Sequence, residues 1–248
     1  MIDFHSHILP GIDDGAKDCA MSIKMLKDAY SAGVQTIIST SHCYPKSDAD
    51  IEKFLQKRAS AYERLSQAIS SEENIPKIIL GCEVNVSTDL AELKNIKKLC
   101  IGNTNYLLVE MPHGNWEEWM IDSVYKLTLL GIRPILAHID RYMFHDQELF
   151  SSLSELGFLY QVNSDLFVSK GVKRIANNLV QSGHIHVIGS DMHNTTTRKS
   201  SVAKAIKVIS KRYGEEAIKQ IYSNSVDILN NEEIKHYFLK TKKRRFLF

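Results

Sequence analysis

The sequence predicts an α/β protein whose parallel strands close into a (β/α)7 barrel, and three observations support this fold class. Short apolar runs alternate with amphipathic helical patterns along most of the 248 residues, which is typical of parallel strands joined by right-handed crossovers. The runs are almost continuously apolar, as expected for strands buried on both faces. Residues of the metal-ligand type follow the carboxyl ends of successive runs. An open, doubly wound sheet would satisfy the first two observations, but only closure brings seven strand ends around one centre.

The expected elements follow one another without a visible domain break, so residues 1–248 are expected to form one domain. Strand-like runs begin at Ile2 and then lie at 34–40, 77–83, 106–110, 133–138, 157–163 and 186–191. Asp18 is expected to cap the first helix and Gly33 to end it. Further helical patterns lie at 48–71, 89–99, 116–130, 172–181 and from about 197 to 240.

The composition excludes several classes of protein. The chain has 44% hydrophobic residues and a formal net charge of +2, so overall charge does not indicate a nucleic-acid partner. Its four cysteines form no C-x-x-C pair and are interpreted as buried thiols of a reducing compartment. No apolar run reaches the roughly 20 residues that span a bilayer. A cleaved leader would remove His5 and His7, so a cytoplasmic location is predicted.

The opening run carries two histidines two positions apart. Side chains at i and i+2 of a strand point to the same face, so His5 and His7 can aim at one point. Neutral imidazoles that converge in this way suit a divalent cation such as Zn, Mn or Fe. A lone H-x-H pair is more often a surface or core feature, so the prediction of a metal site depends on the rest of the chain.

Nine residues of the metal-ligand type are expected at the rim formed by the carboxyl ends of the strands. They are His5, His7, Asp14, His42, Glu83, Glu110, His138, Asp191 and His193. Each could instead be a salt-bridge partner or a hydrogen-bonded core residue. Together they would be costly to bury without cations, because neighbouring carboxylates repel one another and lose their hydration. Shared carboxylates would allow two or three ions, but this donor set does not decide firmly among Mn, Zn and Fe.

Several motifs resemble those of a known family along nearly the whole chain. They are residues 2–15 (IDFHSHILPGIDDG), Thr40-Ser41-His42, Gly81-Cys82-Glu83, the run from His138 to Tyr142 and the run from Gly189 to His193. The chain resembles the PHP (polymerase and histidinol phosphatase) superfamily, and within it the tyrosine-protein phosphatases of bacterial capsule and exopolysaccharide biosynthesis. This resemblance implies a distorted, TIM-like (β/α)7 barrel, a three-metal and usually Mn-dependent centre, and hydrolysis of phosphotyrosine on a bacterial tyrosine autokinase.

The resemblance also implies a ligand set for each metal. The first metal would be held by His5, His7, Glu83 and Asp191. Glu83 would bridge to a second metal held with Glu110 and His138. The third would be held by Asp14, His42 and His193.

Two of these assignments have competitors within the chain. Asp13 competes with Asp14, and His113 is a weaker competitor for Glu110. Many small-molecule phosphatases of the superfamily have histidine at the position of Asp14, and often at that of Glu110. The acidic residues therefore favour the capsule branch over histidinol phosphatase.

The predicted chemistry is metal-assisted hydrolysis of a phosphomonoester. Arg141 would help to neutralise the phosphoryl oxygens, although a structural salt bridge is an alternative role for it. Asp191, His193 or a third metal would assist departure of the tyrosinate. The cysteine mechanism of ordinary tyrosine phosphatases is excluded, because a C-x5-R motif would need arginine at the positions held by Met25, Ala49, Thr88 and Tyr106.

Other functions and partners stay open at this stage. The alternatives are hydrolysis of a small phosphate ester such as histidinol phosphate, phosphodiester cleavage on nucleic acid, amidohydrolase chemistry, and a non-catalytic regulatory role. No aromatic-basic stripe supports a nucleic-acid substrate. The amidohydrolases usually have a bridging lysine where this chain has Glu110. The basic run at 240–248 is either a solvated end or a site of attachment to an anionic membrane, and a homo-oligomer is compatible with the sequence.

Overall fold

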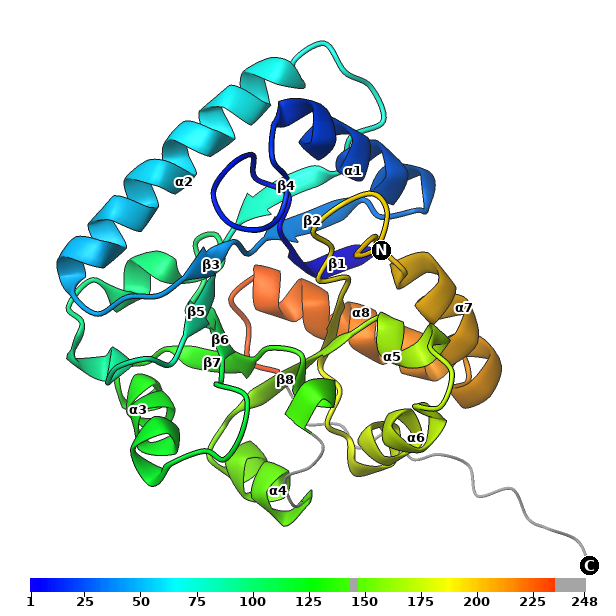
Figure 1. Cartoon of the computed structure of the whole chain (residues 1–248). Coiled ribbons are helices and arrows are strands. Elements are labelled where there is room, and N and C mark those ends of the chain that lie inside the picture. Colours follow the sequence, from blue (N-terminus) through cyan, green and yellow to red (C-terminus); the bar gives the residue numbers. More distant parts are fainter. Residues whose placement is uncertain (143–146, 235–248) are drawn as a thin grey trace, which may run out of the picture.

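The computed structural model describes residues 1–142 and 147–234, and these form a mixed α/β fold built on parallel strands (Figure 1). The strands are β1 (Ile2–Ser6), β2 (Thr36–Ser39), β3 (His42–Cys43), β4 (Lys77–Leu80), β5 (Glu83–Asn85), β6 (Tyr106–Glu110), β7 (Arg133–Leu136), β8 (Leu159–Asn163) and β9 (Val187–Gly189). The basic run at 240–248 lies outside the described residues.

Helices lie around the outside of the strands in Figure 1. The α-helices are α1 (Cys19–Ser31), α2 (Asp48–Ala68), α3 (Glu118–Leu129), α4 (Gln147–Glu155), α5 (Asp165–Val168), α6 (Lys173–Ser182), α7 (Val202–Tyr213) and α8 (Glu215–Leu229), and the 3-10 helices are η1 (Leu90–Glu92), η2 (Ile96–Leu99) and η3 (Ile139–Tyr142). The predicted cap is confirmed, because the Asp18 carboxylate accepts a hydrogen bond from the Met21 amide at 2.8 Å. No helix of the described ranges is long and apolar enough to cross a membrane.

The strands form two parallel sheets. One has the order β1-β2-β4, and the other has the order β3-β5-β6-β7-β8-β9. The chain after β9 returns to β1, where the Asp191 amide donates to the His5 carbonyl at 2.8 Å and the His7 amide donates to the Met192 carbonyl at 2.9 Å. The parallel α/β class that the sequence predicts is therefore confirmed, as a curled sheet.

A buried apolar cluster lies inside this curl. It joins side chains from six strands: Phe4, Ile38, Leu108, Ile135, Leu159 and Val187. A second cluster packs α1 and α2 against β2 and β4, and includes Leu26, Leu65 and Ile37. These clusters remove a large apolar area from water, which is the main favourable term in holding the strands together. They leave the polar strand ends free to form a site.

Three expected elements differ from the prediction. The run expected at 34–40 ends at Ser39, and a separate short strand, β3, follows it. The run expected at 77–83 is divided between β4 and β5, because the Glu83 amide donates to the Thr40 carbonyl at 3.1 Å and starts a new pairing. The helix expected at 89–99 is replaced by η1 and η2, because the Asp48 carboxylate accepts from the Asn95 amide at 2.8 Å and draws the chain out of a helical path. The helices expected from about 197 onward are confirmed within the described residues as α7 and α8.

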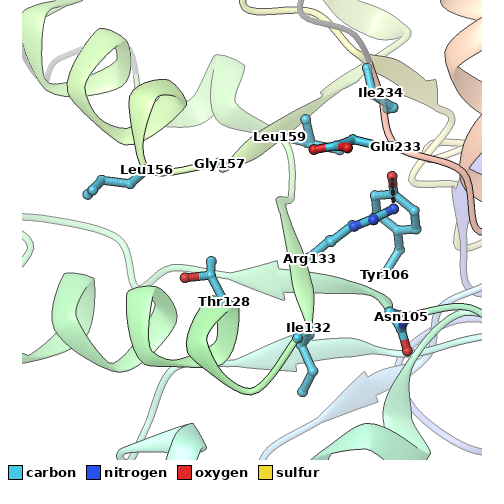
Figure 2. Close-up of a pocket in the computed structure, with 11 residues that line it drawn as sticks. Asn105, Tyr106, Thr128, Ile132, Arg133, Leu156, Gly157, Leu159, Glu233 and Ile234 are labelled. Atoms are coloured by element: carbon cyan, nitrogen blue, oxygen red, sulfur yellow. Dashed lines mark hydrogen bonds between the residues drawn. The ribbon is translucent and has the colours of Figure 1, made fainter.

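The amino ends of β6, β7 and β8 border a hollow of about 260 Å³ (Figure 2). Arg133 lies in it and donates to the Tyr106 hydroxyl at 3.1 Å. Glu233 and Ile234, near the end of the described chain, line the same hollow. It lies at the opposite ends of the strands from the predicted metal ligands, so it plays no part in the site described below.

The close approach of β9 to β1 generates a first prediction, on Gly189. A Cβ at this position would collide with the Cβ of His5 and lie 2.8 Å from its backbone nitrogen. We expect Gly189→Ala to lower the free energy of unfolding in urea by about 3 kcal/mol or more, because neither strand can move without breaking the sheet. Gly131→Ala is the control: its φ of +75° is strained for alanine but its Cβ meets nothing within 4 Å, so about 1 kcal/mol is expected. Equal losses in the two variants would contradict the steric explanation.

Candidate metal centre

The structure brings all nine predicted metal-type residues to one end of the strands. They come from β1 and the loop after it, from β3, β5 and β6, and from the segments that follow β7 and β9. Two of them, His138 and Asp191, have positive φ angles of 33° and 52°. Residues other than glycine seldom adopt this conformation, and where they do the surrounding structure holds them in place for a particular side-chain direction.

Glu83 lies at the centre of the group and is almost fully buried. Its Oε2 is 3.2 Å from His5 Nε2, 3.4 Å from His7 Nε2 and 3.0 Å from His42 Nδ1, and its Oε1 is 2.7 Å from His138 Nε2. Burial alone would raise the pKa of this carboxyl, but the His5 charge, the hydrogen bond from His138 and the close contact with His42 hold it well below its usual range. Glu83 is therefore ionised and faces four imidazoles.

Glu110 adds a second carboxylate beside His138. Glu110 Oε1 is 3.5 Å from His138 Nε2, and the side-chain amide of Asn85 donates to Glu110 Oε2 at 3.2 Å. Glu110 Oε2 is also 4.0 Å from His42 Nδ1. His113, the competitor named above, is exposed, and its ring lies 5.7 Å from that of Tyr142. The structure therefore places Glu110 in the group of metal-type side chains.

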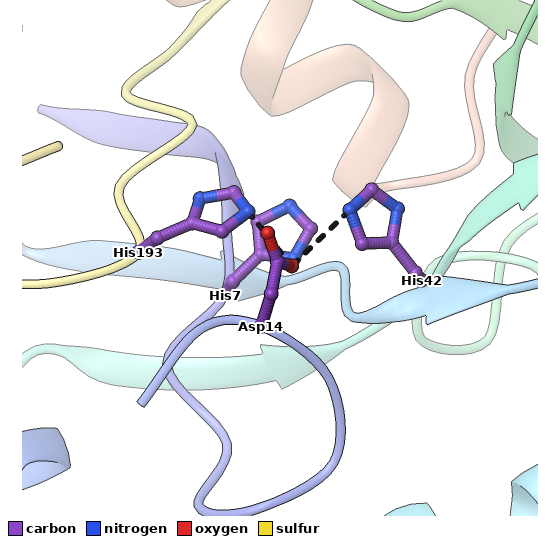
Figure 3. Close-up of side chains that lie close together, drawn as sticks. All are labelled: His7, Asp14, His42 and His193. Carbon is purple, nitrogen blue, oxygen red and sulfur yellow. Dashed lines mark ion pairs between the residues drawn. The ribbon is translucent and has the colours of Figure 1, made fainter. Parts of the chain in front are cut away.

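Asp14 forms a third part of the group with three histidines (Figure 3). Its Oδ1 lies 3.2 Å from His193 Nε2 and 3.5 Å from His42 Nε2. Asp14 itself is largely exposed, at 61%, so this part of the group opens to solvent. The His7 and His193 rings stack beside it with centroids 3.8 Å apart.

Asp13 has a different position from its neighbour. Its Oδ2 lies 2.8 Å from His7 Nδ1 and accepts from the His42 amide at 2.9 Å, and its Oδ1 accepts from the Gly15 amide at 3.0 Å. Because Asp13 holds the outer nitrogen of His7, the inner Nε2 is turned to the centre of the group. This is the arrangement of a carboxylate that orients a metal-ligating histidine.

Asp191 links the histidines to two arginines. Its Oδ1 is 3.5 Å from His7 Nε2 and 3.0 Å from Arg198 Nη2, and its Oδ2 pairs with Arg141 Nη2. Burial would raise the pKa of Asp191, but the His5, Arg141 and other neighbouring charges hold it well below its usual range. The salt-bridge role that the sequence left open for Arg141 is therefore present in this structure.

Sequence reasoning missed Arg198. Its Nη1 lies 3.4 Å from Asp14 Oδ2, so it contacts two carboxylates of the group while remaining 41% exposed. The loop after His193 closes on itself, because the His193 amide donates to the Arg198 carbonyl at 2.8 Å. A cation five residues beyond a predicted ligand was the signal available in the sequence, but only the closed loop returns it to the site.

The donor set fits divalent cations. The Nε2 atoms of His5 and His7 face each other at 3.1 Å, while Gln161 holds the outer nitrogen of His5 at 3.0 Å. Among the described residues, the buried atoms without a hydrogen bond include Glu83 Oε2, His42 Nδ1 and His193 Nε2. Buried polar atoms normally have partners, and cations between them would supply what hydrogen bonds do not. Three subsets of the group have their ligand atoms within 4.8 Å of one another.

The chain is similar in sequence to curated tyrosine-protein phosphatases. The chain is 30% identical to the tyrosine-protein phosphatase YwqE of Bacillus subtilis over 258 residues, which cover 100% of this chain and 99% of that protein. It is 30% identical to the tyrosine-protein phosphatase CpsB of Streptococcus pneumoniae, over 90% of this chain and 95% of that protein.

A solved structure and a family model extend this likeness. A chain from the crystal structures of YwqE from Bacillus subtilis and CpsB from Streptococcus pneumoniae, which are metal-dependent tyrosine phosphatases, superposes with a TM-score of 0.83 at 29% identity. That match covers 96% of this chain and 97% of the other. The family model for capsular polysaccharide synthesis proteins, CpsB/CapC, matches residues 1–230. This chain therefore belongs to the CpsB/CapC family of capsular polysaccharide synthesis.

Proposed function

We propose that this protein is a metal-dependent protein-tyrosine phosphatase that acts in bacterial capsule or exopolysaccharide synthesis. The observation that carries the proposal is the gathering of five imidazoles and three further carboxylates with the buried Glu83, with Arg141 and Arg198 beside them. The named relatives with tyrosine-phosphatase activity support the same conclusion. We further infer that residues 1–248 form one PHP domain whose strands follow a distorted (β/α)7 barrel.

We propose a centre of three cations, with manganese as the first metal to test and zinc or iron as alternatives. The ligands of the first would be His5, His7, Glu83 and Asp191. Those of the second would be Glu83, Glu110 and His138, and those of the third would be Asp14, His42 and His193. The described contacts support this division, because Glu83 touches histidines assigned to all three. When bound, such cations supply Lewis-acid stabilisation of the phosphoryl group and lower the pKa of water.

The chain's own residues would bind and orient the phosphoryl group. Arg141 and Arg198 both reach Asp191 from partly exposed positions, so their remaining N–H groups can donate to phosphoryl oxygens. A tyrosinate leaving group has a pKa of about 10 and needs less protonation than an alkoxide. Burial and the charge of His7 lower the pKa of His193 to about 4, so His193 is neutral at neutral pH. Neutral His193 and ionised Asp191 both suit ligand roles better than proton donation.

The substrate we propose is a phosphotyrosine-bearing bacterial tyrosine kinase of the capsule pathway. Membership of the CpsB/CapC family supports this choice. Attachment to a membrane through residues 240–248, assembly into a homo-oligomer and a cytoplasmic location stay predictions from the sequence. The alternative substrate is a small phosphomonoester such as histidinol phosphate, and the first experiment below separates the two.

Metal removal tests the activity directly. Exhaustive chelation should abolish hydrolysis of a phosphotyrosyl peptide, and manganese should restore it, because bound cations would lower the pKa of the attacking water and supply positive charge. The measurements are initial rates on the peptide and on histidinol phosphate, with metal content determined on the same samples. Activity that survives complete loss of metal would contradict the proposal, and a clear preference for histidinol phosphate would favour the alternative.

Replacing a central ligand tests the site. We expect His5→Ala and Glu83→Ala to lower kcat/KM by roughly a thousandfold or more, because each removes a shared ligand from the centre. Cys43→Ser is the control. Burial raises the pKa of the Cys43 thiol to about 12, so this cysteine is not a nucleophile and little change is expected. A large loss of kcat/KM in correctly folded Cys43→Ser would count against a metal-only mechanism.

Asp13 provides a test of ligand orientation. Asp13→Asn keeps the size of the side chain but removes the negative charge from His7 Nδ1, 2.8 Å away. We expect metal affinity, measured by titrating the chelated protein, to fall roughly 10- to 100-fold. Asp28→Asn is the matched control, because Asp28 is exposed and pairs with Lys24 on α1. Unchanged affinity in Asp13→Asn would show that the carboxylate does not support the centre.

A further inference from the structure

An exposed aromatic side chain, Tyr44, lies at the edge of the metal-type group. Its ring centroid is 5.6 Å from that of His42, and the two planes are inclined by 30°. Tyr44 is 56% exposed, whereas His42 Nδ1 reaches inward to within 3.0 Å of Glu83. The tyrosine ring therefore continues the surface of the site outward from the proposed cations toward solvent.

The sequence places Tyr44 there through the alternation of a strand. His42 and Cys43 form β3, and Tyr44 follows them directly. Side chains two positions apart share a face, so Tyr44 lies on the side of His42, while Cys43 between them is buried on the other side. Pro45, also buried, comes next and restricts the backbone at this point. The position of the ring is thus set by the same strand that positions a proposed ligand.

The Tyr44 ring offers an apolar surface beside charged side chains, because its neighbour His42 contacts both Glu83 and Asp14. By contrast, Trp116, another aromatic residue at this end of the strands, is already packed edge-on against Tyr142 at 5.2 Å and Phe150 at 6.0 Å.

We propose that Tyr44 is a specificity-determining residue that packs against the aromatic ring of phosphotyrosine. This inference depends on the proposed phosphatase function. Cations and arginines bind the phosphoryl group of any monoester, so they cannot by themselves distinguish an aryl from an alkyl ester. The ring of phosphotyrosine is joined to phosphorus through a single oxygen and must lie just outside the phosphate position. Tyr44 provides an exposed aromatic surface beside His42, a proposed ligand, and aromatic rings pack favourably in offset or edge-on arrangements.

Equilibrium binding of two phosphonates tests the proposal without turnover. Phenylphosphonate and methylphosphonate share the anionic group and differ in the ring. Their dissociation constants would be measured by calorimetry on the full-length, manganese-loaded protein. We expect the wild type to bind phenylphosphonate more tightly, and Tyr44→Ala to reduce this preference roughly tenfold while the affinity for methylphosphonate stays the same. Tyr44→Phe should keep the preference, whereas Tyr44→Leu, which has no ring, should lose it.

Tyr222→Ala is the matched control, because Tyr222 is a similarly exposed tyrosine, at 53%, and lies on α8. Metal content and thermal melting of each variant would show that the centre and the fold are intact. Steady-state kinetics on a phosphotyrosyl peptide should show a higher KM and a nearly unchanged kcat in Tyr44→Ala.

Three results would overturn the proposal. They are a wild type without preference for phenylphosphonate, an unchanged preference in Tyr44→Ala, and an equal loss of both affinities, which would mean that Tyr44 acts through the metal centre. A metal-loaded wild type that hydrolyses no phosphotyrosyl peptide would instead refute the proposed function itself. The two failures are therefore distinguishable.

Discussion

One buried carboxylate, Glu83, is the group on which the site depends. An ionised carboxylate in an apolar interior is strongly unfavourable unless opposite charge surrounds it. Here four imidazoles lie within 3.4 Å of its two oxygens. The imidazoles come from three segments of the chain: His5 and His7 from β1 and the residue after it, His42 from β3, and His138 from the segment after β7. The same crowding of donors around one acid is what a shared ligand between cations requires.

The backbone reaches this arrangement through interruptions in two strands. The second and third strand-like runs do not continue beyond β2 and β4, and the short strands β3 and β5 follow them. β3 and β5 pair with each other, with His42 opposite Glu83. Ser39 and Leu80 pair in the sheet before the breaks. The displacement of the chain at residues 40–41 and 81–82 therefore moves both side chains inward over the end of the curled sheet. In a regular, uninterrupted pair of strands, the positions of these two side chains would be fixed by the strict alternation of side chains between the two faces of the sheet.

The site has distinct inner and outer regions. The inner region, with His5, His7, Glu83 and His138, is almost completely buried. The outer region contains Asp14, Arg198 and Tyr44, which are all well exposed. Buried groups hold a fixed geometry because packing leaves them few alternatives, whereas the exposed groups can meet an incoming phosphoprotein. This division agrees with a centre that must be rigid and a substrate that is large.

The sequence by itself determined the parallel α/β class, the order of the elements, the absence of a cysteine-phosphatase motif and the set of nine metal-type residues. These follow from local patterns: alternation of apolar runs, caps such as Asp18, and polar residues at strand ends. Only the tertiary structure decided which of Asp13 and Asp14 faces the centre, that Arg198 returns to it, and that residues 89–99 do not form an α-helix. The physical reason is that these outcomes depend on bonds between distant segments, such as Asp48 to Asn95, and no local pattern of residues encodes them.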